Sequence, residues 1–359
     1  MPSSKESFLS LVCLGIGHRP DALPQDIDWD ATQALANAQG LRAVVLDGIE
    51  ELRKQDSALS FPEKRFLTQW IGEVLQGYEY RYELYRRAIA EMAGFYNSRG
   101  YKMMVLKGYA CSLDWPKPEH RPTGDIDIWQ FGQQKEADSV VSREKGIEVD
   151  KSHHHHTVFY WRDFMVENHY DFVNVHAHRS SAAMEKVFKE LGKDDSHFVE
   201  VYGERVYLPS PNLHALFLIK HMVSHFAAAE ISLRQVLDWA FFVEKHTGEI
   251  NWEWLNKMIE EYHMKDFVSC INAICVDDLG FDSAIFHGVQ FMPELKDRVL
   301  ADIISPAYGT AEPKGMIAKL AYKYRRWKGN AWKQELCYAE SRWDSFWTLL
   351  KSHLMKPEV

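Results

Sequence analysis

Several features that define particular protein classes are scarce or missing in this sequence of 359 residues. Cysteine occurs only five times, in scattered positions without a CxxC pair. This excludes a disulfide framework and a cysteine-based zinc site, and it favours a reducing cytoplasm. No run approaches the about 20 apolar residues that a membrane-spanning helix needs. We therefore expect a cytoplasmic globular protein without a transmembrane segment.

Positive charge is also in deficit. The chain carries 42 Lys and Arg against 51 Asp and Glu, a formal net charge of −9. Nucleic acid is therefore a disfavoured partner, without being excluded, because non-specific binding depends on cations that neutralise phosphates. Residues 314–359 are an exception, since this tail is basic and rich in Trp. The tail is either a helical lid whose Trp side chains pack inward, which we favour, or a surface for anionic partners such as a membrane.

Apolar residues are abundant enough for a sizeable core, at 46% of the chain. The N-terminal stretch MPSSKESFLSLVCLGIG has one early Lys and is followed directly by polar residues, so it predicts a buried helix rather than a signal peptide. A chain of this length suits two or three modules that share an interface.

Hydrophobic periodicity divides the chain into three parts. Residues 5–99 have apolar residues at helical spacing, and helical patterns return from about residue 180. Short apolar runs bounded by turn residues lie between them and predict strands, the later ones antiparallel. The sequence thus predicts an α+β protein with a small mixed sheet, organised as a helical region at 1–99, a central domain at 100–205 and a helical bundle with the basic tail at 206–359.

One of the predicted strands carries two carboxylates. In HRPTGDIDIW (residues 120–129), Asp125 and Asp127 point to the same face, while Ile126 and Ile128 point into the core. Two carboxylates this close repel one another unless a cation lies between them, and hard divalent ions prefer such oxygen ligands. The alternative is a strand at the edge of the sheet with both carboxylates in water.

The segments around this strand favour a metal site. The run YKMMVLKG predicts a strand that ends at Gly108 and enters a helix, and backbone N–H groups at a helix start attract phosphate. In MVENHYDF, Glu167 lies on a predicted strand that would run beside the first. Three carboxylates next to a phosphate-binding turn suit a metal ion and a triphosphate, because bridged ions clamp the oxygens of an in-line displacement at phosphorus.

The segments VLKGYA and HRPTGDIDIW resemble a bacterial family usually described as uncharacterised nucleotidyltransferases, within the nucleotidyltransferase-fold (DNA polymerase β-like) superfamily. The resemblance covers most of the chain, including a DW near the start and a C-terminal helix with an RxxxD pattern. It implies a nucleotidyltransferase fold in the central domain. It also implies an enzyme that transfers a nucleotidyl group from an NTP, such as ATP, to a hydroxyl or phosphate acceptor, with Mg²⁺ or Mn²⁺ as cofactor.

The resemblance also assigns roles to individual residues. Asp125 and Asp127 correspond to the metal-binding pair, and Glu167 would complete the metal site and activate the acceptor. Lys107 and Gly108 would cradle the triphosphate. The superfamily commonly has Gly-Gly or Gly-Ser at this turn, so Lys107 would replace the small residue by acting as a point charge on a phosphate.

Two further residues of the motif are candidates for phosphate contact. They are Arg121, whose alternative role is a structural salt bridge, and Gly124, which directly precedes the carboxylate pair. Sugar phosphate, antibiotic, lipid-linked saccharide, protein and nucleic acid are all compatible acceptors.

The third acid has three candidate positions. Glu167 and His169 match the family's V-E-x-H pattern, and Asp171 is the reserve because it shares a face with Glu167 in a regular strand. A second similar segment, VNVHA, places Asn174 at the acid position. A neutral amide is no general base, so that register would give a non-catalytic nucleotide-binding or interaction protein, which is the alternative function.

Several other polar residues call for an interpretation. Arg234 and Asp238 lie four residues apart on one helical face, where we expect them to form an ion pair beside the active site. His221 and His225 have the same spacing but lack the Glu of HExxH, so we expect a core or cleft-lining role. The four consecutive His at 153–156 are native sequence in this interpretation, and a metal site built from them is the less favoured reading.

Overall fold

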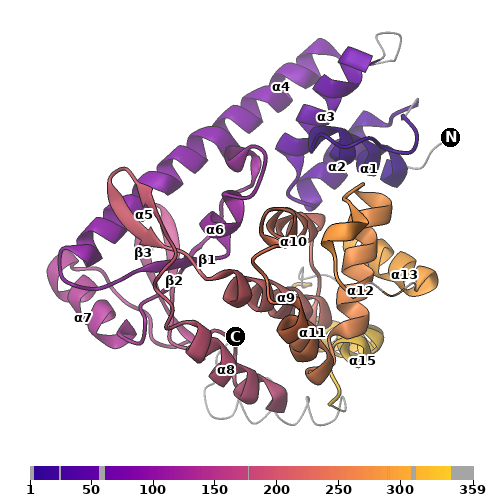
Figure 1. Cartoon of the computed structure of the whole chain (residues 1–359). Helices are drawn as coiled ribbons and strands as arrows, with labels where there is room; N and C mark the ends of the chain where they lie inside the picture. The colour runs from indigo at the N-terminus through magenta and orange to yellow at the C-terminus, as the bar shows by residue number, and fades with distance from the viewer. Residues whose placement is uncertain are drawn as a thin grey trace.

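The computed structural model describes residues 4–23, 26–55, 61–176, 178–288, 290, 292–308 and 313–340. Within these residues, a mixed sheet stands between helices from both ends of the chain, which confirms the predicted α+β class (Figure 1). The strands are β1 (Met104–Leu106), β2 (Ile126–Trp129), β3 (His156–Trp161), β4 (Phe164–His169), β5 (Phe198–Val201) and β6 (Glu204–Tyr207).

The helices form three groups along the chain. Before the sheet lie α1 (Ser4–Gly15), α2 (Trp29–Ala38), α3 (Arg42–Gln55), α4 (Lys64–Val74), the π-helical η1 (Leu75–Tyr80) and α5 (Arg81–Asn97). Among the strands lie α6 (Gly108–Ser112), the 3-10 turn η2 (Pro118–His120), α7 (Gln134–Lys145) and α8 (Arg179–Leu191). The last group is α9 (Pro211–Ala228), α10 (Leu233–His246), α11 (Trp252–Glu261), α12 (Lys265–Ala273), η3 (Ile274–Asp278), η4 (Ser283–Ile285), α13 (Pro293–Ile304), α14 (Met316–Gly329) and α15 (Ala331–Cys337).

The strand order is β3-β4-β2-β1-β6-β5. β2 runs parallel to β4, and β1 runs parallel to β6, while the other neighbours are antiparallel. The predicted antiparallel pairing of the two strands after residue 155 is confirmed, as is the position of the Glu167 strand beside β2. The β5–β6 hairpin was not predicted, since we expected helices from about residue 180.

The sheet separates two hydrophobic cores. On one face, Ile126 and Ile128 are fully buried in a core that includes side chains of α5 and α7, as the alternation along the strand predicts. On the other face, Met104, Leu106 and Trp129 join a larger core with the C-terminal helices. Residues of β2 thus alternate between the two cores, and Asp127 lies on the face of the larger one.

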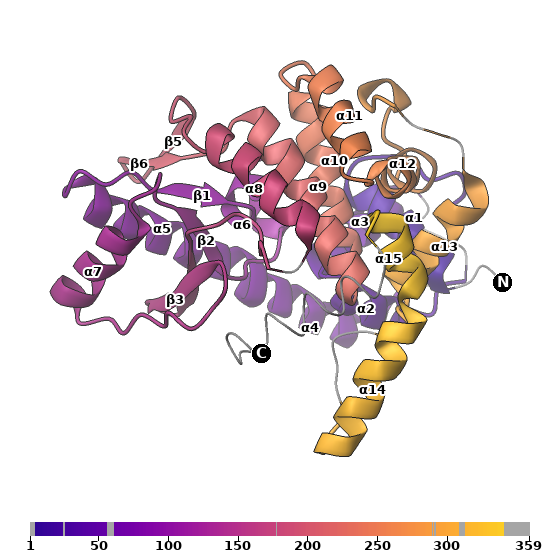
Figure 2. The same ribbon diagram turned by 90° about the horizontal axis from the view of Figure 1, so that it is seen from below.

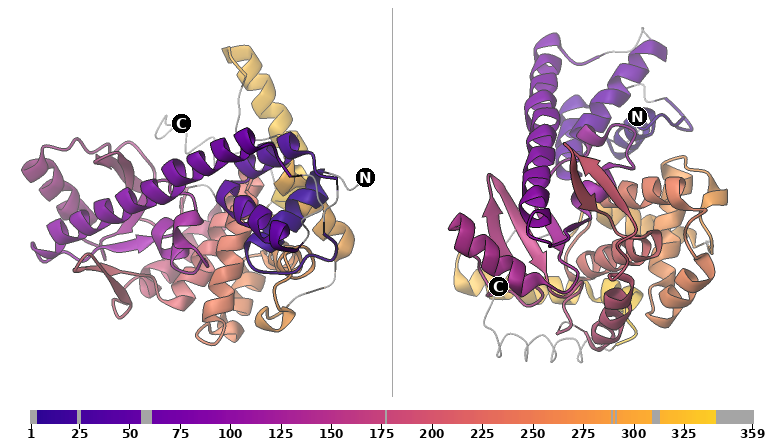
Figure 3. Two further views of the ribbon diagram at one scale, coloured as in Figure 1. Left: turned by 90° about the horizontal axis from the view of Figure 1, so that it is seen from above. Right: turned by 60° about the vertical axis from the view of Figure 1, so that its left-hand side comes forward.

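The helices before the sheet divide between these two cores. α4, η1 and α5 form one long helix that runs from the N-terminal helices to the sheet (Figure 3). α1–α3 instead join the larger core, where Phe8 and Leu11 are fully buried, so the predicted buried helix at the N-terminus is confirmed. Gln39 Nε2 also donates a hydrogen bond of 2.9 Å to the Ile303 carbonyl of α13.

The basic tail is only partly described, since residues 341–359 lie outside the described residues. α15 packs against α9, and Trp332 is partly buried against the larger core. α14 projects from the body of the protein, and its Tyr324 is 63% exposed (Figure 2). The inward packing that we predicted therefore holds for α15, whereas α14 is largely exposed. In the described part of the chain, no helix is long and apolar enough to cross a membrane.

The packing of α1 on α3 depends on small residues. A Cβ added to Gly48 would lie 2.0 Å from the Leu11 carbonyl oxygen, which belongs to rigid helix backbone. We expect Gly48→Ala to lower the free energy of unfolding by about 1–3 kcal/mol, since overpacking forces the helices apart. Denaturant unfolding measures this. Gly72→Ala is the control, because a Cβ added to Gly72 on α4 would meet no atom within 4 Å. This substitution should raise the free energy of unfolding by about 0.5–1 kcal/mol. Equal effects of the two substitutions would contradict the close contact.

Candidate active site

The centre of the site is the buried carboxylate of Asp127. It is 2% exposed, and its Oδ1 accepts hydrogen bonds from Lys107 Nζ at 2.8 Å and from His169 Nε2 at 3.0 Å. Parallel pairing of β2 with β4 places Asp127 opposite Glu167. The site is therefore assembled from three strands: β1 leads into Lys107, β2 carries Asp127, and β4 carries Glu167 and His169.

Lys107 reaches Asp127 through an unusual backbone conformation. It lies between β1 and α6 with φ 42°, in the left-handed region that a residue with a side chain rarely adopts. Such a conformation costs on the order of 1–3 kcal/mol and persists where the surroundings enforce it. Here the ion pair with Asp127 is the compensating contact, and the Lys107 ammonium also lies 5.7 Å from the centre of the Phe217 ring.

The three charged groups stabilise one another. Burial opposes ionisation of Asp127, but Lys107 and His169 outweigh it and hold the pKa of the carboxyl well below its usual range. Burial likewise opposes the charge on His169, yet its contacts with Asp127 and Glu167 raise its pKa to about 9. Since His169 Nδ1 also lies 3.1 Å from the Asp171 carbonyl oxygen, both ring nitrogens donate and the imidazolium is the favoured form.

The other two acids lie at the edge of this cluster. Glu167 Oε2 is 3.6 Å from His169 Nε2 and 3.8 Å from His156 Nδ1. Asp125 directly precedes β2 and is half-buried, and its pKa is raised by burial and then by the charge of Asp127. Of the three acids, Asp125 alone has a raised pKa, and a metal ion bound between it and Asp127 would favour its ionised form.

The donor set fits a divalent ion. Asp127, Glu167 and His169 each carry an atom of a type that can bind a metal, and these atoms lie within 4.8 Å of one another. His169 would bind an ion only after losing a proton, because an imidazolium has no free lone pair. His155, His156 and His169 form a second such group, so His169 belongs to both. Carboxylate oxygens suit Mg²⁺ and Mn²⁺, whereas imidazole nitrogens favour Mn²⁺ over Mg²⁺.

Arg121 and Asp238 form a buried ion pair with one another. Arg121 Nε and Nη2 donate to the two Asp238 carboxylate oxygens at 2.7 and 2.9 Å, and both residues are at most 5% exposed. The predicted pairing of Arg234 with Asp238 is therefore wrong, because the Asp238 carboxylate faces the loop before β2. Arg121 fixes that loop to α10. Its contacts are those of a structural salt bridge, the role that the sequence offered as the alternative to phosphate contact. Trp115 Nε1 donates a third hydrogen bond to Asp238, at 2.9 Å.

The two candidate glycines differ in their surroundings. A Cβ on Gly108 would lie 2.5 Å from the Tyr85 hydroxyl, which donates a hydrogen bond of 2.8 Å to the Asp125 carbonyl. Gly108 thus allows α5, α6 and the start of β2 to meet. Gly124 is exposed, and a Cβ there would meet no atom within 4 Å.

Ten of the eleven predicted site residues border one or both of two adjoining cavities. The smaller, of about 370 Å³, is lined by Lys107, Gly108, Cys111, Arg121, Gly124, Asp125, Asp127, Glu167, Leu218, His221, Met222, His225, Arg234, Gln235 and Asp238. The larger, of about 640 Å³, shares Lys107, Glu167, His221 and His225 with it and borders His169. We call the smaller cavity the nucleotide pocket and the larger cavity the acceptor chamber. As predicted, His221 and His225 line a cleft.

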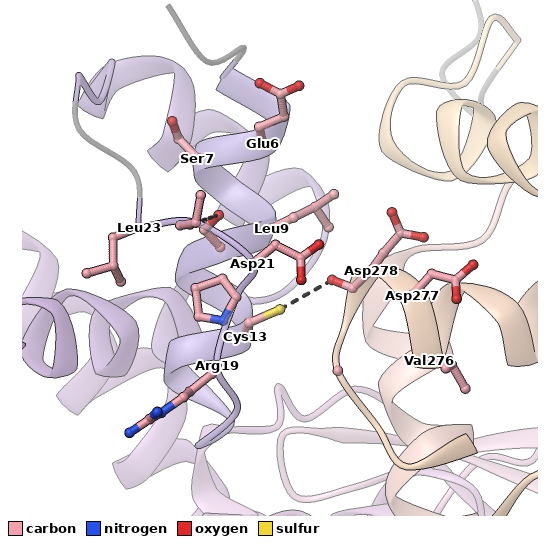
Figure 4. A pocket seen from close by; sticks show the side chains of 14 residues that line it. Glu6, Ser7, Leu9, Cys13, Arg19, Asp21, Leu23, Val276, Asp277 and Asp278 are labelled. Atoms are coloured by element: carbon pink, nitrogen blue, oxygen red, sulfur yellow. Dashed lines mark hydrogen bonds between the residues drawn. The ribbon is translucent and has the colours of Figure 1, made fainter. Parts of the chain in front are cut away.

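A third cavity, of about 550 Å³, lies between α1 and η3, away from these residues (Figure 4). The carboxylates of Asp21, Asp277 and Asp278 gather at it, which disfavours an anionic ligand there. Lys107, Arg121 and Arg234 line the smaller of the two adjoining cavities instead.

The two alternatives to Glu167, Asp171 and Asn174, lie outside β4. β4 ends at His169, so Asp171 does not continue the strand as we expected, and its carboxylate pairs with Lys189 of α8. Asn174 lies in the following turn and accepts a hydrogen bond of 2.9 Å from the His176 N–H. Sequence reasoning missed Lys220, which lines the acceptor chamber; its signal was a lone Lys within the apolar run NLHALFLIKHM.

The structural role of Arg121 can be tested by stability. We expect Arg121→Ala to cost about 3–5 kcal/mol, because it leaves Asp238 buried without its counterion. Lys54→Ala breaks an exposed pair with Glu51 and should cost less than about 1 kcal/mol. Chemical denaturation of both variants measures the difference. A small loss for Arg121→Ala, similar to that of the control, would show that the pair does not fix the loop.

Comparison with known proteins identifies a family for most of the chain. Residues 25–279 match the family described as "Uncharacterised nucleotidyltransferase". No curated relative matches the sequence. Among solved structures, the chain is similar to an antigenic nucleotidyltransferase-like protein from Paracoccidioides brasiliensis, with 13% identity and a TM-score of 0.37 over 56% of this chain and 96% of the other. That similarity is too low to bear on the site, whereas the family match spans well over half of the chain. The chain therefore belongs to the family of uncharacterised nucleotidyltransferases.

Proposed function

We propose that this protein is an active, metal-dependent nucleotidyltransferase. It binds an NTP in the nucleotide pocket and transfers the nucleoside monophosphate to a hydroxyl or phosphate acceptor, with release of pyrophosphate. The observation that carries the proposal is the position of Asp127 opposite Glu167 on parallel strands, with Asp125 two residues before Asp127 at the same pocket. When bound, two Mg²⁺ or Mn²⁺ ions would clamp the attacking and leaving oxygens and neutralise the charge that develops on the phosphate.

Glu167 is suited to accept the proton of the acceptor hydroxyl. Burial disfavours its charged form, but the contact with His169 outweighs burial and lowers the pKa of Glu167, so the carboxylate is ionised at neutral pH. It borders both cavities, which places it where a nucleotide and an acceptor would meet. Asp125 and Asp127 border the nucleotide pocket alone and would hold the metal ions.

Arg234 is the cation best placed for the triphosphate. In the described part of the chain, it is half-buried in the nucleotide pocket and forms neither a hydrogen bond nor an ion pair. Burial, followed by the charge of Arg121, lowers its pKa. A half-buried guanidinium without a counterion favours an anionic ligand, because a phosphate accepts charge-assisted hydrogen bonds from its fork of donors.

The alternative function is a non-catalytic nucleotide-binding or interaction protein on the same fold. The contact between Lys107 and Asp127 favours it, because the ammonium neutralises the carboxylate without a metal ion. For catalysis, Lys107 would have to turn from Asp127 to a phosphate oxygen. The two functions differ in whether nucleotide binding depends on a divalent ion.

Metal-dependent nucleotide binding is the first test. We expect Mg²⁺ or Mn²⁺ with one of the four NTPs, at about 100 times the dissociation constant, to stabilise the protein by roughly 2.7 kcal/mol in thermal unfolding. Glu167→Gln and Asp125→Asn should abolish the metal-dependent part, since each removes a proposed ligand. Asp171→Asn is the matched control and should leave it unchanged, because the Asp171 carboxylate pairs with Lys189 instead.

Three other outcomes would change the conclusion. Stabilisation by an NTP that is the same with and without a divalent ion would support the non-catalytic function. No stabilisation by any NTP would contradict both. Loss of the metal-dependent part in Asp171→Asn, but not in Glu167→Gln, would move the third acid to Asp171.

Arg234 gives a second prediction. We expect Arg234→Met to weaken NTP binding roughly tenfold or more, because one charged hydrogen bond is worth about 1.5–3 kcal/mol. Its stability without ligand should not fall, since the side chain has no counterion to lose. Arg143→Met, on the exposed face of α7, is the control and should bind like the wild type. Titration calorimetry measures both, and equal affinities would exclude Arg234 from the phosphate site.

A further inference from the structure

The acceptor chamber differs from the nucleotide pocket in its charge. It extends from the shared residues along α9 towards α14 and α15. Away from these shared residues, its described lining contains Lys220, Lys323 and Arg326 and no carboxylate. At about 640 Å³, the chamber has the size of a small-molecule site.

Lys220 is a buried lysine of this chamber whose ammonium has no carboxylate partner among the described residues. It is 3% exposed, and its one hydrogen bond in the described part of the chain is a long one, 3.3 Å to the Tyr338 hydroxyl. The ammonium also lies 4.6 Å from the centre of the Tyr338 ring. The nearby Glu340 carboxylate instead binds His178 at 3.2 Å and the Ser180 N–H at 2.7 Å. Lys220 thus forms no ion pair with any described residue.

Another buried lysine of the same helical bundle does have a carboxylate partner. Lys333 is fully buried, pairs with Asp302 and donates a hydrogen bond of 2.8 Å to the Ala229 carbonyl. Lys107 is likewise paired with Asp127. An ammonium without a counterion is costly to bury, and burial accordingly lowers the pKa of Lys220 to about 8. A ligand that supplies negative charge beside it would therefore be favoured.

We propose that the acceptor chamber binds a small acceptor through a phosphate group held by Lys220. This rests on the proposed function and names the acceptor class: a phosphomonoester that also carries a hydroxyl. A phosphate is favoured over a singly charged group because Lys220, Lys323 and Arg326 line the part of the chamber that the nucleotide pocket does not share. Ser181 and Asn174 line it as well and offer neutral hydrogen-bonding groups to the rest of the acceptor.

The reaction balances with these components alone. The acceptor hydroxyl oxygen forms a bond to the α-phosphorus of the NTP, and the bond from that phosphorus to the bridging oxygen of the β-phosphate breaks. Pyrophosphate leaves with that oxygen, and the hydroxyl proton passes to Glu167, which borders both cavities. The phosphate of the acceptor stays on Lys220 throughout and does not react.

The test uses inorganic phosphate as the probe on the full-length protein without nucleotide. We expect titration calorimetry to show phosphate binding that is weakened at least tenfold by Lys220→Met and retained by Lys220→Arg, which keeps the charge. Arg143→Met, which removes a positive charge on the exposed face of α7, is the control and should bind phosphate like the wild type. No phosphate binding to the wild type, or binding lost in Arg234→Met and retained in Lys220→Met, would overturn the proposal.

Thermal unfolding separates a binding role of Lys220 from a structural one. We expect Lys220→Met to melt at or above the wild-type temperature, because it removes an uncompensated buried charge. Lys333→Met should melt lower, since it leaves Asp302 without its partner. A large loss of stability in Lys220→Met would assign the ammonium to the fold and contradict the anion site.

Different results would contradict the proposed function and the proposed acceptor site. Asp125→Asn should bind phosphate like the wild type, because Asp125 does not line the chamber. If the protein binds phosphate through Lys220 but binds no NTP, the anion site is supported and nucleotidyl transfer is contradicted. If it binds an NTP but no phosphate, nucleotidyl transfer is supported and the anion site is contradicted.

Discussion

The site depends on one buried carboxylate held between two cations. Asp127 lies on the side of β2 that faces the larger core, where an isolated charge would be strongly disfavoured. Lys107 and His169 compensate it from the two neighbouring strands, so the three strands are tied together by charge as well as by their backbone hydrogen bonds. The left-handed backbone of Lys107 and the raised pKa of His169 are both consistent with this arrangement.

The pairing of β2 with β4 is equally important, because strand side chains alternate between faces. A shift of one residue would turn Glu167 towards the smaller core and bring Val166 or Asn168 beside Asp127. Apolar burial prevents that shift, since Ile126 and Val166 are fully buried on the opposite face. The smaller hydrophobic core thus helps to specify the geometry of the carboxylates from the opposite face of the sheet.

Much of this could be predicted from local sequence patterns. The alternation in DIDIW, the strand end at Gly108 and the Glu of MVENH indicated which side chains would lie together, because each depends on the period of a strand. The partner of Asp238 could not be predicted in this way. Helical spacing favoured Arg234, but the tertiary contact with Arg121, from a loop 117 residues earlier, is the one that forms. The end of β4 at His169, the β5–β6 hairpin and the union of α1–α3 with the C-terminal core are long-range outcomes of the same kind.

The shared residues of the two cavities have a consequence for the order of events. His221 and His225 stand on successive turns of α9 and border both cavities, as Glu167 does from the sheet. In a nucleotidyltransferase built this way, donor and acceptor occupy adjoining spaces at the same time, and each has its own cations. Such a layout corresponds to a ternary complex and direct transfer, in which the nucleotidyl group is never stored on the protein between the two substrates.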